Sequence, residues 1–155
     1  MNRFSFFFTR IRLYENIGLD EAYIAMEKFM QKFTIDELSD YTENWVVTGK
    51  LNESTLADNF HFVSPFWKSY DKAAFLEKFL DPTEYQQKAL SNILRFDPMF
   101  RLKSDDHKSF ALIFQYHTKY GVSVDETVLG NIENGLIVEL RSIYDLEKTK
   151  QAHKL

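Results

Sequence analysis

Cysteine is absent from this sequence of 155 residues, and so is any apolar run of the length that crosses a bilayer. Without cysteine the chain has no disulfide framework, no thiolate metal site and no cysteine nucleophile. A membrane-spanning helix requires about 18 or more consecutive apolar residues, so we predict none. These absences suit a protein of a reducing compartment, and we expect a cytoplasmic location.

Positive charge is also scarce, because 19 Lys and Arg residues face 23 Asp and Glu residues and the net charge is −4. This balance argues against nucleic acid as a partner. The exception is the N-terminal extension, residues 1–18, in which Arg3, Arg10 and Arg12 precede the first acid. Its apolar stretch, residues 4–8, is too short for the core of a signal peptide. We expect the extension to dock on its own domain, and the alternatives are contact with a membrane surface or with the groove of a partner protein.

Aromatic residues are abundant, with 15 Phe and 8 Tyr. Each aromatic side chain buries a large area, and such side chains often line cavities. The length of the chain predicts a single domain. We place this domain at residues 19–148 and assign residues 149–155 to a polar C-terminal tail.

Helix signals occupy the first third of the chain. Asp20 is expected to cap an amphipathic helix that continues to about residue 32. Thr34 and Glu37 form the capping-box pattern of a second helix that begins at residue 35, and Gly49 provides its stop. Asn52 is expected to cap a short third helix that reaches about residue 58.

Strand signals follow. A short strand with Phe60 and Phe62 on one face ends before Pro65, and an aromatic loop leads to a helix that starts at Asp71. Residues 85–90 are compatible with either a helical turn or the start of a strand. Further strands are expected at residues 96–103, 109–119, 122–132 and 136–144. Helices followed by antiparallel strands predict an α+β fold, in which N-terminal helices pack on one face of a strongly curved antiparallel sheet.

Two details of these strands carry positional information. The turn at Asn134-Gly135 is the strongest hairpin signal in the chain. Pro98, which follows Asp97 inside an expected strand, indicates an edge strand or a bulge because proline removes a hydrogen-bond donor from the ladder.

The order of these elements resembles the nuclear transport factor 2-like superfamily, and specifically its SnoaL-like branch. The residues that carry the likeness are Trp45 and Gly49, the segment FHFVSP at residues 60–65, Phe75, and the segment NGLIVE at residues 134–139 that runs on to Tyr144-Asp145. The resemblance covers residues 35–148 and implies a cone-shaped domain with an internal pocket. Members include isomerases, cyclases, hydrolases, dehydratases and non-catalytic binding modules, so the fold alone does not define the activity.

The catalytic pattern of ketosteroid isomerase-like members is incomplete in this chain. Their general base, an aspartate just before the proline, corresponds to Ser64. The resemblance assigns an oxyanion-binding tyrosine to the long helix, where Tyr41 is the candidate. These members also have a protonated acid on a later strand, and its position falls near Val128 in this chain. Asp125 and Glu126 are close in sequence, but a shift of the strand register is needed to bring either of them to that position. Isomerase chemistry is therefore disfavoured by the sequence.

We expect a pocket that binds a hydrophobic small molecule, without a cofactor or a metal. The predicted ligand-binding residues are Trp45, Phe62, Ser64, Trp67, Phe114, Tyr116 and Tyr144. If the chain is an enzyme, we expect lyase, isomerase or cyclase chemistry with Tyr41 as hydrogen-bond donor and Asp145 as acid or base. The alternative for Asp145 is a cap at the end of its strand.

A second hypothesis is a non-enzymatic interaction module with a filled core. His61 and His117 are expected to point away from the pocket, on the outer face of the sheet, together with Ile113 and Gln115. This face is the one through which we expect a homodimer to form.

Overall fold

The computed structural model describes residues 32–80 and 84–154. The predicted N-terminal extension and the helix expected from Asp20 fall outside these residues. Phe33–Leu155 make up one compact unit. No described helix is long and apolar enough to cross a membrane.

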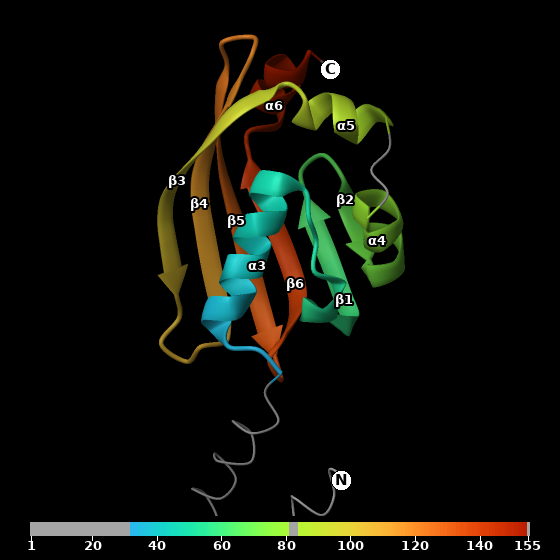
Figure 1. Cartoon of the computed structure of the whole chain (residues 1–155), viewed down its shortest axis with the longest axis vertical. Helices are drawn as coiled ribbons and strands as arrows, with labels where there is room; N and C mark the ends of the chain where they lie inside the picture. Colours follow the sequence, from blue (N-terminus) through green and yellow to red (C-terminus); the bar gives the residue numbers. More distant parts are fainter. Residues whose placement is uncertain (1–31, 81–83, 155) are drawn as a thin grey trace, which may run out of the picture. The chain divides into compact units, whose positions relative to one another are not determined.

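The unit combines short helices with one large sheet (Figure 1). Its described helical elements are α3 (Ile35–Thr48), the 3-10 turn η2 (Glu53–Thr55), α4 (Lys72–Leu80), α5 (Glu84–Leu90) and α6 (Leu146–His153). Its strands are β1 (Leu56–Ser64), β2 (Lys68–Asp71), β3 (Ile93–Lys103), β4 (Ser109–Thr118), β5 (Ser123–Glu133) and β6 (Leu136–Tyr144).

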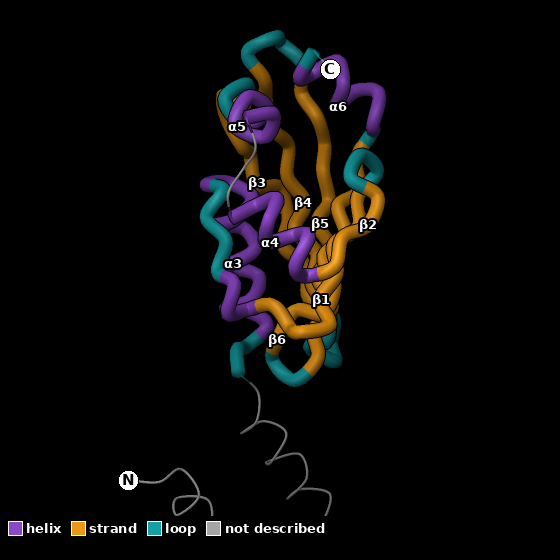
Figure 2. The backbone as a smooth tube through the Cα atoms, turned by 90° about the vertical axis from the view of Figure 1, so that its right-hand side faces the viewer, coloured by secondary structure: helices purple, strands orange, loops and turns teal. Residues whose placement is uncertain are grey.

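The sheet has the strand order β2-β1-β6-β5-β4-β3 and is curved but not closed. Figure 2 shows α3 and α4 on one side of it. These features confirm the predicted α+β class. One detail differs, because β1 and β6 pair in parallel and the sheet is therefore mixed. The chain leaves β2 at one edge, passes through α4 and α5, and enters β3 at the other edge. Three antiparallel pairings then bring β6 beside β1 in the same direction.

Helix α3 begins and ends where its sequence predicts. Thr34 and Glu37 form a capping box, and Gly49 closes the helix with φ of 73°. Hydrogen bonds from Thr34 to the Glu37 carboxylate lower the pKa of that side chain. The buried side chains of the helix are Ile35, Leu38, Ser39, Thr42 and Trp45.

Ion pairs fix the other side of α3 against β3. Arg101 pairs with Asp40 and Glu43, and Lys103 donates to Asp36 at 2.5 Å. Because α3 crosses the concave face of the sheet, its Trp45 is directed toward the core that the strands build.

Strand β4 alternates between buried and partly exposed residues along its whole length, as its sequence predicts. The buried set is Phe110, Leu112, Phe114, Tyr116 and Thr118. The opposite, outer face of the sheet has exposed apolar side chains at Phe100, Leu102 and Ile143. Homodimerisation through this face stays a prediction.

Edge strand β3 confirms the expectation raised by Pro98. The strand lies at the end of the sheet order, and its register shifts between Pro98 and Phe100. The turn between β5 and β6 likewise confirms the hairpin signal, since Asn134 and Gly135 both have positive φ.

Three local expectations were wrong. The short helix from Asn52 is only the 3-10 turn η2, because β1 already begins at Leu56. The aromatic loop after Pro65 contains strand β2, which pairs with β1. The supposed polar tail continues helix α6 through His153, and Ala152 and His153 are buried.

Gly130 of β5 lies directly opposite Phe110 of β4. A Cβ atom at Gly130 would come within 2.3 Å of the Phe110 ring, which is itself buried. We therefore expect Gly130→Ala to lower the free energy of unfolding by about 1 to 3 kcal/mol through overpacking. Urea denaturation measures this loss. Adding Phe110→Leu should recover part of it, and strictly additive effects of the two substitutions would contradict the contact.

Candidate functional site

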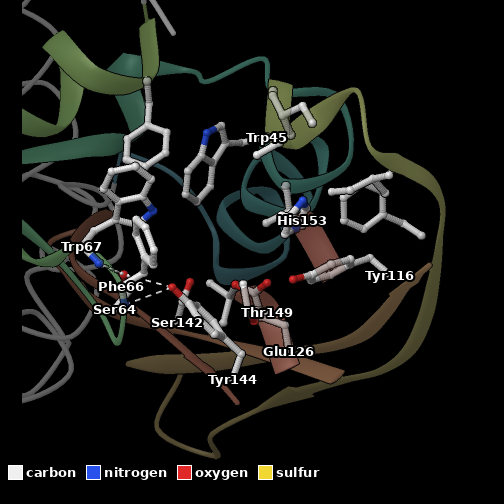
Figure 3. A pocket seen from close by; sticks show the side chains of 18 of the residues that line it. Trp45, Ser64, Phe66, Trp67, Tyr116, Glu126, Ser142, Tyr144, Thr149 and His153 are labelled. Atoms are coloured by element: carbon white, nitrogen blue, oxygen red, sulfur yellow. Dashed lines mark hydrogen bonds between the residues drawn. The ribbon is translucent and has the colours of Figure 1, made fainter. Parts of the chain in front are cut away.

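A cavity of about 330 Å³ opens between the concave face of the sheet and the helices (Figure 3). This volume falls at the lower end of the range of ligand sites. Of the described α-helices and strands, all except β2 contribute to its walls. The lining residues come from α3, β1 and the loop after it, α4, α5, β3, β4, β5, β6 and α6.

One wall of the cavity is aromatic. Trp45, Phe62 and Phe79 meet there in edge-to-face contacts, with ring centroids 5.5 to 6.2 Å apart. Phe66 and Trp67 extend this wall at the loop that follows β1, with their own ring centroids 4.8 Å apart. The wall is therefore suited to the faces of a ring-containing molecule.

The other wall is polar and belongs mainly to the sheet. Figure 3 shows oxygen atoms of Tyr116, Glu126, Ser142 and Tyr144 along this side of the cavity, together with Thr149 from α6. The register of β5 and β6 brings the polar groups of these two strands together. Glu126 lies opposite Tyr144, and in the next pair that faces the cavity Val128 lies opposite Ser142. The cavity thus offers hydrogen-bonding groups on one side and aromatic rings on the other.

Glu126 is the group with the most altered chemistry in this wall. Burial among protein groups raises the pKa of its carboxyl to about 7, although a hydrogen bond with Ser142 works in the opposite direction. At neutral pH the carboxyl is therefore close to half ionised. Such a group can both take up and release a proton, as general acid–base chemistry requires.

Helix α6 covers the wall near Tyr116. The rings of Tyr116 and His153 lie 5.6 Å apart, and a side-chain hydrogen bond links Tyr116 to Thr149. Burial raises the pKa of the Tyr116 hydroxyl, so this group stays protonated. Burial also lowers the pKa of His153, whose imidazole is hydrogen-bonded to the backbone of Ala89. Among the described residues the His153 Nδ1 atom finds no hydrogen-bond partner.

Ser64 organises the loop beside the aromatic wall. Its hydroxyl oxygen accepts a hydrogen bond from the Trp67 backbone N–H at 3.0 Å and lies 3.5 Å from the Tyr144 hydroxyl. The Phe66 backbone N–H donates a hydrogen bond to the Tyr144 hydroxyl oxygen at 3.2 Å. Ser64 is the position that corresponds to the general base of ketosteroid isomerase-like proteins. In this chain its hydroxyl group instead positions two aromatic residues of the cavity, Trp67 and Tyr144.

The structure brings together six of the residues that the sequence singled out. Trp45, Phe62, Ser64, Trp67, Tyr116 and Tyr144 all line the cavity. Phe114 lies instead beside a separate hollow of about 120 Å³ between α3 and β3, with its ring 5.8 Å from that of Phe96.

The two candidate catalytic residues lie elsewhere. Tyr41 is exposed on α3, with its ring 5.8 Å from that of Phe33, and it does not line the cavity. Asp145 caps α6 by accepting a hydrogen bond from the Lys148 backbone N–H at 2.9 Å. This geometry matches the alternative that the sequence left open for Asp145, a cap at the end of its strand.

Glu126 and His153 are the important lining residues that sequence reasoning missed. Alternation along β5 carried a signal for the first, since Glu126 falls between Val124 and Val128, both of which are buried on the inner face. Val128, near which the resemblance places a neutral acid, is two residues away on this same face. No comparable signal marked His153, because its position depends on how α6 folds back onto the sheet.

A metal site is not apparent in the part of the chain that the structure describes. No group of three or more His, Asp or Glu side chains there has an arrangement that could hold an ion. His61 and His117, which the sequence places away from the pocket, lie on the outer face and contact Glu139 and Asp97 respectively.

Comparison with known proteins gives structural but no sequence matches. No family model and no curated protein matches the chain. A protein of unknown function with a cystatin-like fold from Xanthomonas campestris superposes with a TM-score of 0.60 at 15% identity, over 78% of this chain and 98% of the other. A steroid delta-isomerase from Pseudomonas aeruginosa gives a TM-score of 0.59 at 14% identity, over 80% and 90%.

An NTF2-like protein of unknown function from Cytophaga hutchinsonii superposes with a TM-score of 0.51 at 14% identity, over 76% of this chain and 95% of that one. Similarity at this level of identity concerns the fold, and it agrees with the strand order and curvature described above. The chain therefore has the cone-shaped α+β fold of nuclear transport factor 2-like proteins.

Proposed function

We propose that this chain binds a small, mostly apolar, ring-containing molecule in the aromatic cavity, and that Glu126 exchanges a proton with it. The observation that carries the proposal is a carboxyl group with a pKa of about 7 inside a cavity whose opposite wall is aromatic. Perturbed pKa values cluster at functional sites, so a carboxyl of this kind in an aromatic-lined cavity is a candidate for the functional group.

The chemistry of the polar wall favours isomerase or lyase reactions. An ionised Glu126 takes a proton from a carbon next to a carbonyl group, and its protonated form returns one. The Tyr116 hydroxyl, which burial keeps protonated, is the proposed donor to the substrate oxygen where negative charge develops. The steroid delta-isomerase among the structural neighbours supports this reaction class for the fold. The acid–base group then lies on β5 rather than at Ser64.

Filling the cavity tests the binding step. The probe is prodan, a neutral two-ring ketone whose emission shifts to the blue in apolar surroundings. Ala89 of α5 lines the cavity, so Ala89→Trp should occupy part of the space and weaken prodan binding at least about tenfold. Fluorescence titration measures the dissociation constant.

Ala73→Trp is the matched control, because Ala73 is an exposed position on α4 outside the cavity lining. We expect this variant to bind prodan as the wild type does. Failure of the wild type to bind prodan, or equal binding by the Ala89→Trp variant, would refute the proposed cavity function.

A further inference from the structure

The lining of the cavity contains an acidic side chain but no lysine or arginine among the described residues. The one acidic side chain among these residues is Glu126. His153, which faces the same space from α6, is kept neutral because burial lowers its pKa. Tyr116 of β4 is kept neutral because burial raises the pKa of its hydroxyl. The remaining titratable lining group is the Tyr144 hydroxyl of β6, which is hydrogen-bonded to the Phe66 backbone.

This set disfavours anionic ligands. A carboxylate or phosphate in the cavity would meet no cation from the described lining and would be repelled by ionised Glu126. Transfer of an unpaired anion from water to such a site is strongly unfavourable. The aromatic wall adds to this effect, because the faces of aromatic rings are the negative ends of their quadrupoles.

The same features favour a cation. At the polar wall the Glu126 carboxylate provides the counter-charge for an ammonium group. The aromatic faces across the cavity do not repel a cation as they repel an anion. The chain itself offers an example at the edge of the aromatic wall, where the Lys78 ammonium lies 4.3 Å from the ring centroid of Trp67 and 5.7 Å from that of Tyr70. Lys78 itself is not part of the cavity lining.

We propose that the cavity selects a protonated aromatic amine, whose ammonium group pairs with the Glu126 carboxylate while its rings pack against Trp45, Phe62 and Phe79. This inference rests on the binding step of the proposed function, since it names the ligand class of the same cavity. The proton that Glu126 exchanges with such a ligand belongs to the ammonium group rather than to a carbon atom. The Ser142 hydroxyl, which is hydrogen-bonded to Glu126, holds the carboxylate in place for the pair.

Three probes with one ring system and different charges test the inference. Naphthylmethylamine is cationic, naphthylmethanol is neutral, and naphthoate is anionic. Calorimetric titration of the full chain at pH 8, where Glu126 is mostly ionised, should show the amine binding at least about tenfold more tightly than the alcohol. Naphthoate should show no measurable binding.

Two neighbouring substitutions locate the charge that is responsible. Glu126→Gln should weaken amine binding at least about tenfold and change alcohol binding less than about twofold. Asp125→Asn is the matched control, because Asp125 is the adjacent residue, is exposed on the outer face and accepts a hydrogen bond from Gln115. This control should bind all three probes as the wild type does.

The outcomes separate the two proposals. If the alcohol binds and the amine binds no more tightly, the amine inference is wrong and the cavity function stands. The same conclusion follows if the Glu126→Gln variant keeps the amine preference. If the wild type does not bind prodan, the proposed function fails, and the inference that rests on it fails as well.

Discussion

Replacement of Phe75 by alanine should lower the free energy of unfolding by about 3 to 5 kcal/mol, the usual cost of removing a fully buried Phe side chain. Phe75 of α4 is completely buried. Its ring centroid lies 4.6 to 5.3 Å from those of four other aromatic residues, which are Trp45, Phe60, Phe62 and Phe79. Its removal leaves a void at the centre of this cluster, and the surrounding rings belong to three different elements.

The loss is measured by urea or thermal denaturation. Phe100→Ala provides a matched control, since the same ring is removed at a position that is 63% exposed on β3. We expect this control to change stability by less than about 0.5 kcal/mol. Because Trp45, Phe62 and Phe79 also line the cavity, Phe75→Ala should weaken prodan binding as well. Similar stability losses for the two variants would contradict the central role of Phe75.

Glu126→Gln should remove much of the pH dependence of stability near neutrality. In the folded chain the Glu126 carboxyl has a pKa of about 7, against an ordinary value of 4.5. The folded chain therefore holds a proton that the unfolded chain releases at lower pH. As the pH rises from about 5 to 8, ionisation favours the unfolded chain, and the wild type loses about 2 to 3 kcal/mol from this group. Above the folded pKa the loss is complete.

Glutamine has no proton to release in this range. The free energy of unfolding of the Glu126→Gln variant should therefore rise relative to that of the wild type by about 2 to 3 kcal/mol between pH 5 and pH 8. Denaturation curves at several pH values measure the shift. Asp125→Asn is the matched control, because it removes the adjacent carboxyl group, which is exposed on the outer face, and should leave the contribution of Glu126 in place. A Glu126→Gln curve parallel to that of the wild type would show that burial does not hold this carboxyl neutral.

Much of the fold was predictable because its signals are local. The capping box at Thr34 and Glu37 and the stop at Gly49 depend on residues a few positions apart, and α3 has these bounds. The alternation along β4 follows from the two-residue period of a strand. The turn at Asn134-Gly135 needs only two residues that tolerate positive φ.

The rest of the fold depends on contacts between distant residues. The parallel pairing of β1 with β6 joins residues about eighty positions apart, such as Phe62 and Leu140. The burial of His153 depends on α6 folding back over the sheet, and nothing in the composition of residues 149–155 indicates an apolar face of that kind. The sequence placed Glu126 in the right region but not in the site, because the resemblance puts the acid near Val128, two residues further along the strand.

By itself the sequence determined the fold class, the bounds of α3, the faces of the long strands and most of the aromatic residues around the cavity. These are properties of local spacing and of the tendency of aromatic side chains to be buried. Only the tertiary structure decided that Tyr41 and Asp145 lie away from the cavity, that His153 lies beside it, and that Glu126 is its acid–base candidate. The physical reason is that the pKa of a carboxyl depends on the groups around it in space, and desolvation of Glu126 arises only when β4, β5, β6 and α6 are brought together.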